Sequence, residues 1–277
     1  MSATTARRPQ GWRAGLILLL LLGARPAAAG VQEVKFDAEL YGRTRQVWIW
    51  TPPAIPADSA GLLIVFDGAQ YQDDIPLPRM LDSLTAAGSI RPVVAVLIDN
   101  GTGVVRRQDL ANRAEFADWL SDQLVPWVRK HYAVSHDSRR TIVCGSSAGG
   151  LAAAYVAFKR PDLFGNVLSQ SGAFWRGNEN SDGAPYEWLT AQYPLAPRAH
   201  TRFWLDVGAL ETKGTLGGTA PSILAANRRL RDALRKEGYE VLYTEIPGGV
   251  HSPASWAAHL PAALVALAGQ SPGSAKR

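Results

Sequence analysis

The fold is decided by the stretch Thr141-Ile142-Val143-Cys144-Gly145-Ser146-Ser147-Ala148-Gly149-Gly150-Leu151-Ala152-Ala153-Ala154. An apolar, β-rich run ends directly at Gly145, and a helix of small residues is expected directly after Ser147. A G-x-S-x-G pattern in this setting is typical of a nucleophile elbow, a strained strand-to-helix turn that exposes a reactive serine. The helix N-terminus also favours developing negative charge. We therefore interpret Ser147 as a nucleophile; the alternative is a glycine-rich turn at a helix start.

Apolar runs alternate with helical patterns on both sides of this stretch, from about residue 31 to 268. The runs lack polar alternation, which is typical of strands covered on both faces in a parallel sheet. Together with the elbow, the alternation predicts an α/β-hydrolase fold, with a mostly parallel central sheet flanked by helices. Strands are expected near 47–50, 62–66, 93–98, 141–144, 203–205 and 240–246, and helices near 113–130, 151–159 and 221–237.

The N-terminal residues predict export. Residues 1–29 have the pattern of a secretory signal peptide: arginines, a short apolar run, then Ala27-Ala28-Ala29 at a cleavage site. The apolar run is about half the roughly 20 residues that span a bilayer, so an uncleaved membrane anchor is the weaker reading. We expect a periplasmic or secreted protein without a stable anchor after cleavage. Residues 30–268 would form a single domain that includes a surface loop at 177–184. A disordered tail at 269–277 would follow it.

The charge and cysteine content exclude several classes of protein. The sequence has 29 basic and 24 acidic residues, but residues 1–29 hold four arginines and no acid, so 25 basic residues face 24 acidic ones afterwards. A nucleic-acid partner is not expected, because it would need a basic surface on the folded domain. Cys144 is the one cysteine, so no intrachain disulfide can form. Metal-binding spacings such as HExxH and CxxC are missing, and we expect no metal and no organic cofactor.

A serine nucleophile needs a base to take its proton, and in this fold the order along the chain is serine, acid, histidine. His251 and His259 both lie late enough. His251 follows the predicted strand 240–246 and a Pro-Gly-Gly turn, where such folds present the base. His259 falls within a terminal helical pattern and is expected to be structural. We therefore predict His251 as the base.

The acid should lie in the loop after the strand near 203–207, where Asp206 and Glu211 compete. Asp206 falls at the strand end and would serve equally to hold the loop backbone. Glu211 lies in the loop itself, where its carboxylate can reach His251 to orient the imidazole and stabilise the imidazolium. Glu211 is favoured on this ground, and Asp206 remains the alternative.

An oxyanion hole needs two backbone N–H groups. One should come from Ala148, the residue after the nucleophile. The second should come from the loop after the strand 62–66, where Asp67-Gly68-Ala69 lets the backbone approach closely. Gly68 and Ala69 are both candidates, and the sequence does not decide between them.

Several further segments resemble the putative-esterase branch of the α/β-hydrolases, in particular the enterochelin (enterobactin) esterase group. They are Leu63-Ile64-Val65-Phe66-Asp67-Gly68, Arg106-Arg107-Gln108-Asp109-Leu110, Phe164 to Gly172, Asn227-Arg228-Arg229-Leu230, and Gly248-Gly249-Val250-His251 with Trp256. The similarity covers essentially the whole predicted mature chain. Two positions depart from the family pattern: Val250 interrupts the usual Gly-Gly-His run, and Asp109 replaces the more common glutamate.

The resemblance implies a set of roles. It supports Ser147, Glu211 and His251 as a catalytic triad, because Gly208 and Glu211 match the family's Gly-x-x-acid element. It also implies that Arg106 contacts an anionic catecholate substrate, the alternative being a surface arginine paired with Asp109. The expected partner is a small-molecule ester, with a ferric siderophore of the enterobactin type as the best single candidate.

Three hypotheses about function follow. The leading one is an exported serine carboxylic-ester hydrolase that works through an acyl-serine intermediate. The second keeps the same triad but acts as an acyltransferase, or as a carbohydrate or feruloyl-type esterase. The third, from a different class, is a non-catalytic binding protein on a hydrolase scaffold.

Overall fold

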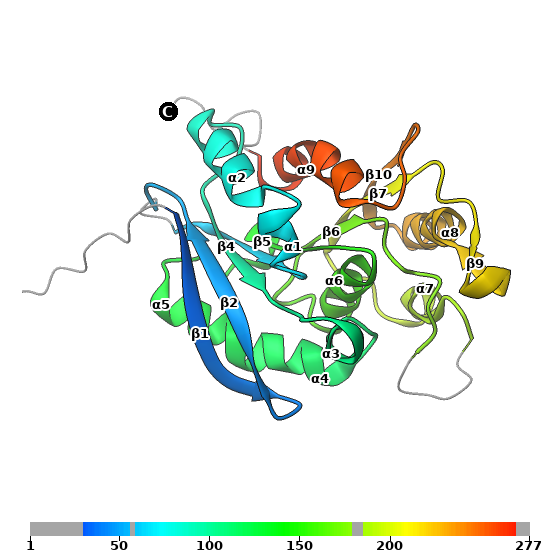
Figure 1. Ribbon diagram of the computed structural model, residues 1–277, viewed down its shortest axis with the longest axis horizontal. Helices are drawn as coiled ribbons and strands as arrows, with labels where there is room; N and C mark the ends of the chain where they lie inside the picture. The colour runs from blue at the N-terminus through cyan, green and yellow to red at the C-terminus, as the bar shows by residue number, and fades with distance from the viewer. Residues whose placement is uncertain (1–29, 56–58, 179–184, 270–277) are drawn as a thin grey trace, which may run out of the picture.

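The computed structural model of the chain describes residues 30–55, 59–178 and 185–269 (Figure 1). The predicted signal peptide lies outside these residues, as do residues 179–184 of the predicted loop and 270–277 of the predicted tail. Among the helices of the described ranges, none is long and apolar enough to cross a membrane.

The described residues contain an eight-stranded sheet with the order β1-β2-β4-β3-β5-β6-β7-β10. The first two strands form an antiparallel hairpin, β2 pairs antiparallel with β4, and every pair from β4 to β10 is parallel. This order and direction confirm the predicted α/β-hydrolase fold. The strands are β1 (Gly30–Leu40), β2 (Arg43–Thr51), β3 (Gly61–Val65), β4 (Val93–Ile98), β5 (Thr141–Ser146), β6 (Asn166–Gln170), β7 (Arg202–Gly208) and β10 (Glu240–Ile246), with β8 (Gly214–Thr215) and β9 (Ala220–Ser222) in a separate small ribbon.

Helices cover both faces of the sheet, as Figure 1 shows. Side chains of α1, α2 and α9 pack into the core on one face. Those of α4 to α8 pack into the core on the other. The helices are α1 (Gln70–Asp73), α2 (Leu77–Ala86), α3 (Gly103–Asp109), α4 (Ala114–Trp119), α5 (Val125–His131), α6 (Ala148–Lys159), α7 (Trp188–Gln192), α8 (Ile223–Lys236) and α9 (Pro253–Ala268), with short 3₁₀ turns at Ser138–Arg140, Tyr193–Leu195 and Leu216–Gly218.

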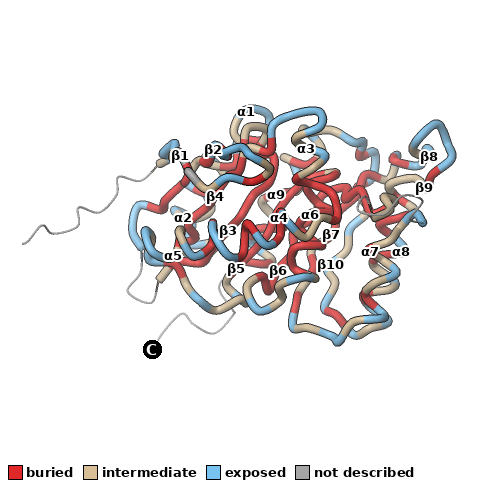
Figure 2. The backbone as a smooth tube through the Cα atoms, turned by 90° about the horizontal axis from the view of Figure 1, so that it is seen from below, coloured by how far each residue is buried: buried red, intermediate tan, exposed pale blue. Residues whose placement is uncertain are grey.

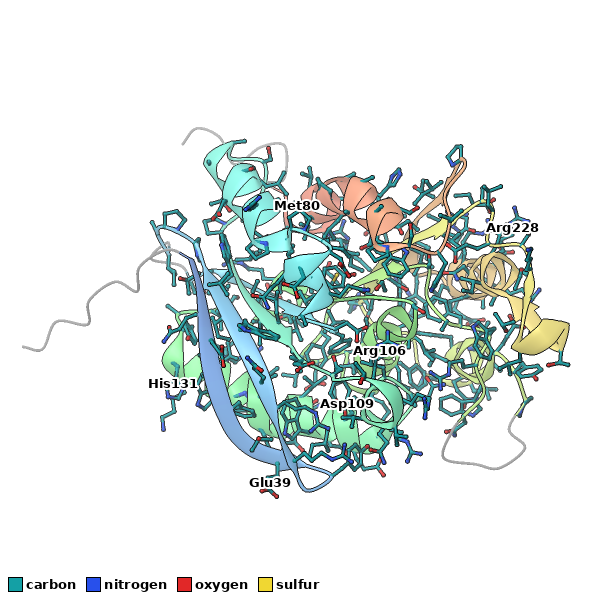
Figure 3. All side chains as sticks on the ribbon, in the orientation of Figure 1. Glu39, Met80, Arg106, Asp109, His131 and Arg228 are labelled. Carbon is teal, nitrogen blue, oxygen red and sulfur yellow. The ribbon has the colours of Figure 1, made fainter. Side chains whose placement is uncertain are left out.

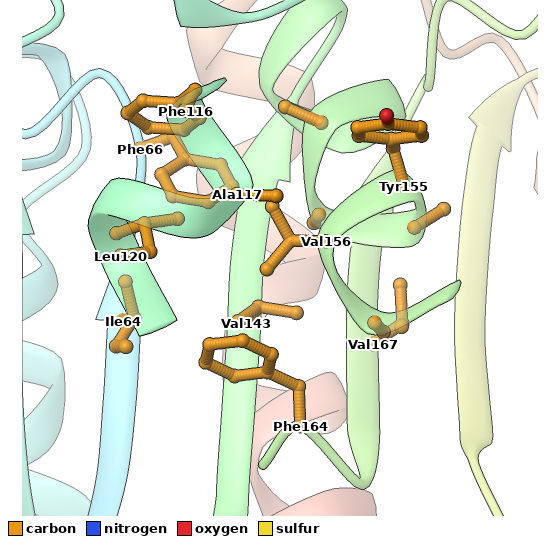
Figure 4. Close-up of a cluster of buried hydrophobic side chains, with 14 of the residues drawn as sticks. Ile64, Phe66, Phe116, Ala117, Leu120, Val143, Tyr155, Val156, Phe164 and Val167 are labelled. Atoms are coloured by element: carbon orange, nitrogen blue, oxygen red, sulfur yellow. The ribbon is translucent and has the colours of Figure 1, made fainter. Parts of the chain in front are cut away.

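The central strands are buried on both faces, which explains their continuous apolar sequence (Figure 2). Successive residues of a strand point to opposite faces, so Leu63 belongs to the core under α2 and α9, whereas Ile64 belongs to the core under α4 and α6. Figure 4 shows part of the second core, where Phe66 and Phe116 meet edge to face with ring centroids 5.3 Å apart. The nucleophile segment is therefore held between two packed layers.

All six predicted strands are confirmed, and α6 and α8 confirm two of the predicted helices. The helix predicted at 113–130 is present as α4 and α5, but a π-helical segment (Leu120–Leu124) joins them. Pro126 explains why the helix widens into a π-helical turn here, because proline lacks an N–H and its ring crowds the carbonyl of residue 122. The sequence did not predict β1 or β6. The second omission matters, because β6 lies beside β5 and leads into the site.

Candidate active site

Ser147 occupies the sharp turn between β5 and α6. Its backbone has φ 55° and ψ −118°, a conformation that costs free energy for a residue with a side chain. Three hydrogen bonds hold it there: its N–H donates to Gln170 O at 2.9 Å, and its carbonyl accepts from Leu151 at 3.2 Å and from Ala173 at 2.8 Å. Gly145 is required at this turn, because a Cβ there would lie 2.5 Å from the carbonyl carbon of Gly149. The strand-to-helix turn predicted from the sequence is thus present.

His251 lies after β10 and reaches across the ends of the strands to Ser147. Its Nε2 is 3.0 Å from Ser147 Oγ, and its Nδ1 is 2.6 Å from Glu211 Oε2. A carboxylate only accepts hydrogen bonds, so the ionised Glu211 places the imidazole hydrogen on Nδ1 and leaves Nε2 to accept from the Ser147 hydroxyl. His259 lies on α9, as predicted. The structure therefore brings Ser147, His251 and Glu211 into one hydrogen-bonded chain.

The two candidate acids occupy different environments. Glu211 lies after β7, is buried, and receives the Gly208 N–H at Oε1 over 2.9 Å while Oε2 contacts His251. Asp206, on β7, is fully buried and contacts Trp204 Nε1 at 2.9 Å and Gln170 Nε2 at 3.3 Å instead. Of the two carboxylates, Glu211 is the one in contact with the imidazole.

Burial shapes the titration of Asp206. Removal from water raises the pKa of its carboxyl to about 7, the hydrogen bonds from Trp204 and Gln170 oppose this rise, and the charge of Glu211 adds to it. Its Oδ1 has no hydrogen-bond partner among the described residues. Asp206 is thus a buried acid that takes up a proton near neutral pH, beneath the site.

The loop after β3 separates the two candidates for the second oxyanion donor. The N–H of Gly68 donates to Ile98 O at 2.7 Å, so it is committed to β4. Gly68 must be glycine, because a Cβ there would lie 2.7 Å from the carbonyl carbon of Leu97. Ala69 stands at the start of α1, and Ala148 is the first residue of α6, where helical N–H groups have no partner within their helix. Because the Gly68 N–H is already bonded, Ala69 remains as the candidate from this loop, beside Ala148.

Arg106 lies on α3 (Figure 3). Its side chain forms an ion pair with Asp67 in the loop after β3. Its Nε and Nη2 donate to the two carboxylate oxygens of Asp67 at 2.6 and 2.7 Å. Burial lowers the pKa of Arg106, but the hydrogen bonds and charge of Asp67 outweigh it, so the net pKa is raised. The alternative pairing with Asp109 is wrong.

Asp109 is instead part of a buried network behind the loop. It accepts two hydrogen bonds from Arg45, at 2.7 and 2.9 Å, and one from Asn100 Nδ2 at 3.1 Å. Asn100 Oδ1 in turn accepts the N–H of Asp67 at 2.8 Å. Asp67 has a left-handed backbone, with φ 54°. The network and Arg106 together fix this strained residue, which is two residues before the candidate oxyanion donor Ala69.

One hollow lies at the loop after β3, and another lies at the chain of hydrogen bonds. The first is polar and is lined by Asp67, Ala69, Gln70, Asp99, Gly101, Thr102 and Arg106. The second is lined by Leu210, Glu211, Lys213, Ile223, Val250 and His251. Leu210 and Val250 are 60% and 47% exposed, and both line the second hollow, so they give it an apolar surface.

Three buried residues near the site were assigned no role from the sequence. Ser171 and Trp256 contact Glu211 and His251, and both fall in segments that carry the family resemblance, but no local pattern distinguishes them from packing residues. Cys144 lies on β5 beneath the elbow. Burial raises the pKa of its thiol to about 12, and its Sγ contacts the hydroxyl of Tyr71 at 3.9 Å.

Comparison with known proteins places these residues in a wider group. The family described as "Putative esterase" matches residues 38–267. The Iron(III) enterobactin esterase of Escherichia coli strain K12 is 31% identical over 239 residues, which are 85% of this chain and 56% of that protein. The Endo-1,4-beta-xylanase/feruloyl esterase of Xylanibacter ruminicola is 27% identical over 105 residues, 37% of this chain and 14% of that protein.

A solved structure gives the same picture. The enterobactin esterase of Shigella flexneri, crystallised in the presence of enterobactin, superposes with a TM-score of 0.75 at 27% identity, covering 86% of this chain and 58% of that one. The chain therefore spans somewhat more than half the length of these two esterases.

Proposed function

Because this chain belongs to the putative esterase family, we propose that it is a serine carboxylic-ester hydrolase that works through an acyl-serine intermediate. The observation that carries the proposal is the chain of contacts from Glu211 through His251 to Ser147, at 2.6 and 3.0 Å, on a strained strand-to-helix turn. A hydroxyl is a poor nucleophile without an adjacent base, and this arrangement supplies one.

Each group then has a defined task in the proposed reaction. Ser147 Oγ attacks the ester carbonyl carbon while His251 Nε2 takes the hydroxyl proton. The N–H groups of Ala148 and Ala69 hold the negative oxygen of the tetrahedral intermediate. The intermediate collapses to the acyl-serine as His251 returns the proton to the departing alcohol. Water then attacks the acyl-serine by the same route, which releases the acid and restores the serine. Glu211 orients the imidazole and stabilises its charged form throughout.

The substrate we propose is a catecholate siderophore trilactone of the enterobactin type, in its ferric form. Two relatives support it by what their names state: one is an Iron(III) enterobactin esterase, and the other was crystallised with enterobactin. Arg106 also lines the polar hollow, and a guanidinium that binds Asp67 with two of its five N–H groups retains others for an anionic ligand. We further propose that residues 1–29 direct export, which would place hydrolysis in the periplasm or outside the cell.

The first experiment is chromatography of ferric enterobactin after incubation with the protein, beside a Ser147→Ala control. Linear or monomeric catechol products from the wild type alone would support both the nucleophile and the substrate. An intact trilactone, with an aryl ester still cleaved by the wild type and not by the variant, would keep the esterase and reject the siderophore. Failure of a fluorophosphonate to label Ser147 would instead favour a binding protein on a hydrolase scaffold.

A feruloyl-type esterase is the second candidate, because the relative from Xylanibacter ruminicola carries that activity in its name. The apolar side chains of Leu210 and Val250 at the second hollow would suit an aromatic group. Methyl ferulate separates the candidates: its hydrolysis by a protein that leaves enterobactin intact would favour this one. Adding a sugar acceptor and looking for a transferred acyl group tests acyltransferase activity.

A further inference from the structure

Ser171 and Trp256 extend the hydrogen-bonded chain beyond Glu211. Ser171 Oγ donates to Glu211 Oε1 at 2.6 Å, and the Gly208 N–H donates to the same oxygen at 2.9 Å. The other oxygen, Oε2, faces His251 Nδ1. Three donors therefore share the two carboxylate oxygens, and rotation of the carboxylate would break at least one of these bonds.

Trp256 sets the direction of the Ser171 hydroxyl. Its Nε1 lies 3.0 Å from Ser171 Oγ. An indole N–H only donates, so Ser171 Oγ must accept at this contact, and its own hydrogen remains for Glu211. The Trp256 ring also meets His251 edge to face, with centroids 5.0 Å apart and planes at 90°. One side chain thus contacts both the imidazole and the serine that holds the carboxylate.

The backbone at Ser171 is held in a costly conformation. Its φ is 50°, in the left-handed region that residues other than glycine and asparagine seldom adopt. Its N–H donates to Asp206 O at 2.7 Å, which ties the end of β6 to β7, and the residue is 1% exposed. Such strain persists where the surroundings fix it, and it concentrates at functional sites.

We propose that Ser171 and Trp256 are positioning residues for catalysis, which fix the Glu211 carboxylate and the His251 ring relative to Ser147. They act through these two residues and do not touch the substrate. The proposal rests on the hydrolase function proposed above. It goes beyond that function, because it assigns roles to two side chains outside the Ser147, His251 and Glu211 chain.

The kinetic test uses Ser171→Ala and Trp256→Phe. Ser171→Ala removes the bond to Glu211 and the bond from Trp256, whereas Trp256→Phe removes only the bond to Ser171. Each variant keeps most of the side-chain volume. Turnover of an aryl ester is expressed per Ser147 site titrated with a fluorophosphonate, so that unfolded protein is not counted. We expect kcat to fall by about tenfold to a hundredfold with KM nearly unchanged, because geometry at the reacting atoms is lost and binding is not. The double variant should lose little more than one single variant, since both hydrogen bonds serve one function.

Ser169→Ala is the matched control. Ser169 is a buried serine on β6, two residues before Ser171, and its Oγ has no hydrogen-bond partner among the described residues. Its kcat should equal that of the wild type. If Ser171→Ala and Trp256→Phe also keep the wild-type kcat per titrated site, the proposed positioning role is wrong.

A spectroscopic measurement separates this proposal from the proposed function. The Nδ1–H of His251 in its short bond to Glu211 should give a low-field proton NMR resonance in the free protein. We expect this resonance to shift or disappear in Ser171→Ala and to remain in Ser169→Ala. A wild type that cleaves no ester but shows this pattern would reject the hydrolase, while showing that Ser171 still fixes the Glu211 carboxylate against His251. An unshifted resonance in Ser171→Ala would overturn the positioning role, whatever the activity.

Discussion

The Arg106 guanidinium holds both oxygens of the Asp67 carboxylate, and Asp67 is two residues before the candidate oxyanion donor Ala69. The arginine on α3 thereby fixes the loop after β3 from the side of the polar hollow. The side chain of Asp67 is 8% exposed, so loss of its cationic partner would leave a largely buried charge uncompensated.

Arg106→Lys should lower kcat/KM by roughly tenfold to a hundredfold, because an ammonium cannot make the two parallel contacts of a guanidinium. Measuring kcat/KM with a neutral ester and with an anionic ester separates two contributions to this loss. Loss on the neutral ester measures positioning of the loop, and any additional loss on the anionic ester measures contact with substrate. Arg107→Lys, at the exposed neighbouring position, is the control and should leave both rates unchanged.

Substitution of the two acids should have very different effects on turnover. Glu211→Gln removes the negative acceptor at His251 Nδ1, and we expect kcat to fall by roughly a thousandfold to ten-thousandfold. Asp206→Asn leaves that contact in place and should keep kcat within about tenfold. Steady-state kinetics on one aryl ester decides between them, and the reverse order would make Asp206 the functional acid.

Asp206 also predicts a pH dependence of stability. Its pKa is raised to about 7 in the folded chain, from an ordinary value of 3.8. Between about pH 4 and pH 7 the folded state binds a proton that the unfolded state has lost, so this group's contribution to the free energy of unfolding falls as the pH rises. The full effect is on the order of 4 kcal/mol. Urea unfolding across this window should show Asp206→Asn gaining stability relative to the wild type as the pH rises; a constant difference would contradict the raised pKa.

Gly68→Ala should weaken both stability and turnover. The new methyl group would lie 2.7 Å from the Leu97 carbonyl carbon and 2.8 Å from the Ile98 nitrogen, so the loop must move away from β4. We expect a loss of about 1–3 kcal/mol in the free energy of unfolding. If Ala69 moves with the loop, kcat should fall by roughly a hundredfold. Gly88→Ala, whose methyl group would meet open space at a φ of 64°, should lose some stability through backbone strain but keep full turnover.

The nucleophile turn could be predicted because its causes are local. The β-run, the small residues and the serine all fall within residues 141–154, and the backbone geometry follows from them. The partner of Arg106 could not be predicted in the same way. Asp109 is three residues away in sequence, but it accepts hydrogen bonds from Arg45 on β2. Arg106 instead pairs with Asp67, which is 39 residues away. Such choices depend on how α3 is set against the sheet.

The strand β6 shows the same limit for secondary structure. Asn166, Ser169 and Gln170 interrupt its apolar pattern, although all three are fully buried. Distant groups make this burial tolerable: Asn166 donates to Arg139 O and Thr141 O, and Gln170 donates to Trp256 O. Since these partners come from other parts of the chain, the polar residues resemble a loop when they are read in sequence. The position of Ser171, directly after this strand, could not be predicted from the sequence for the same reason.

The buried thiol of Cys144 can report local unfolding of the protein through its rate of chemical labelling. The thiolate is the form that attacks thiol reagents, and burial keeps this sulfur both protonated and out of reach. Because the sequence has no other cysteine, every labelling event on the intact chain reports the opening of one place, the strand beneath the elbow. The rate of labelling under native conditions would measure how often the centre of the sheet separates, without denaturant and without substrate.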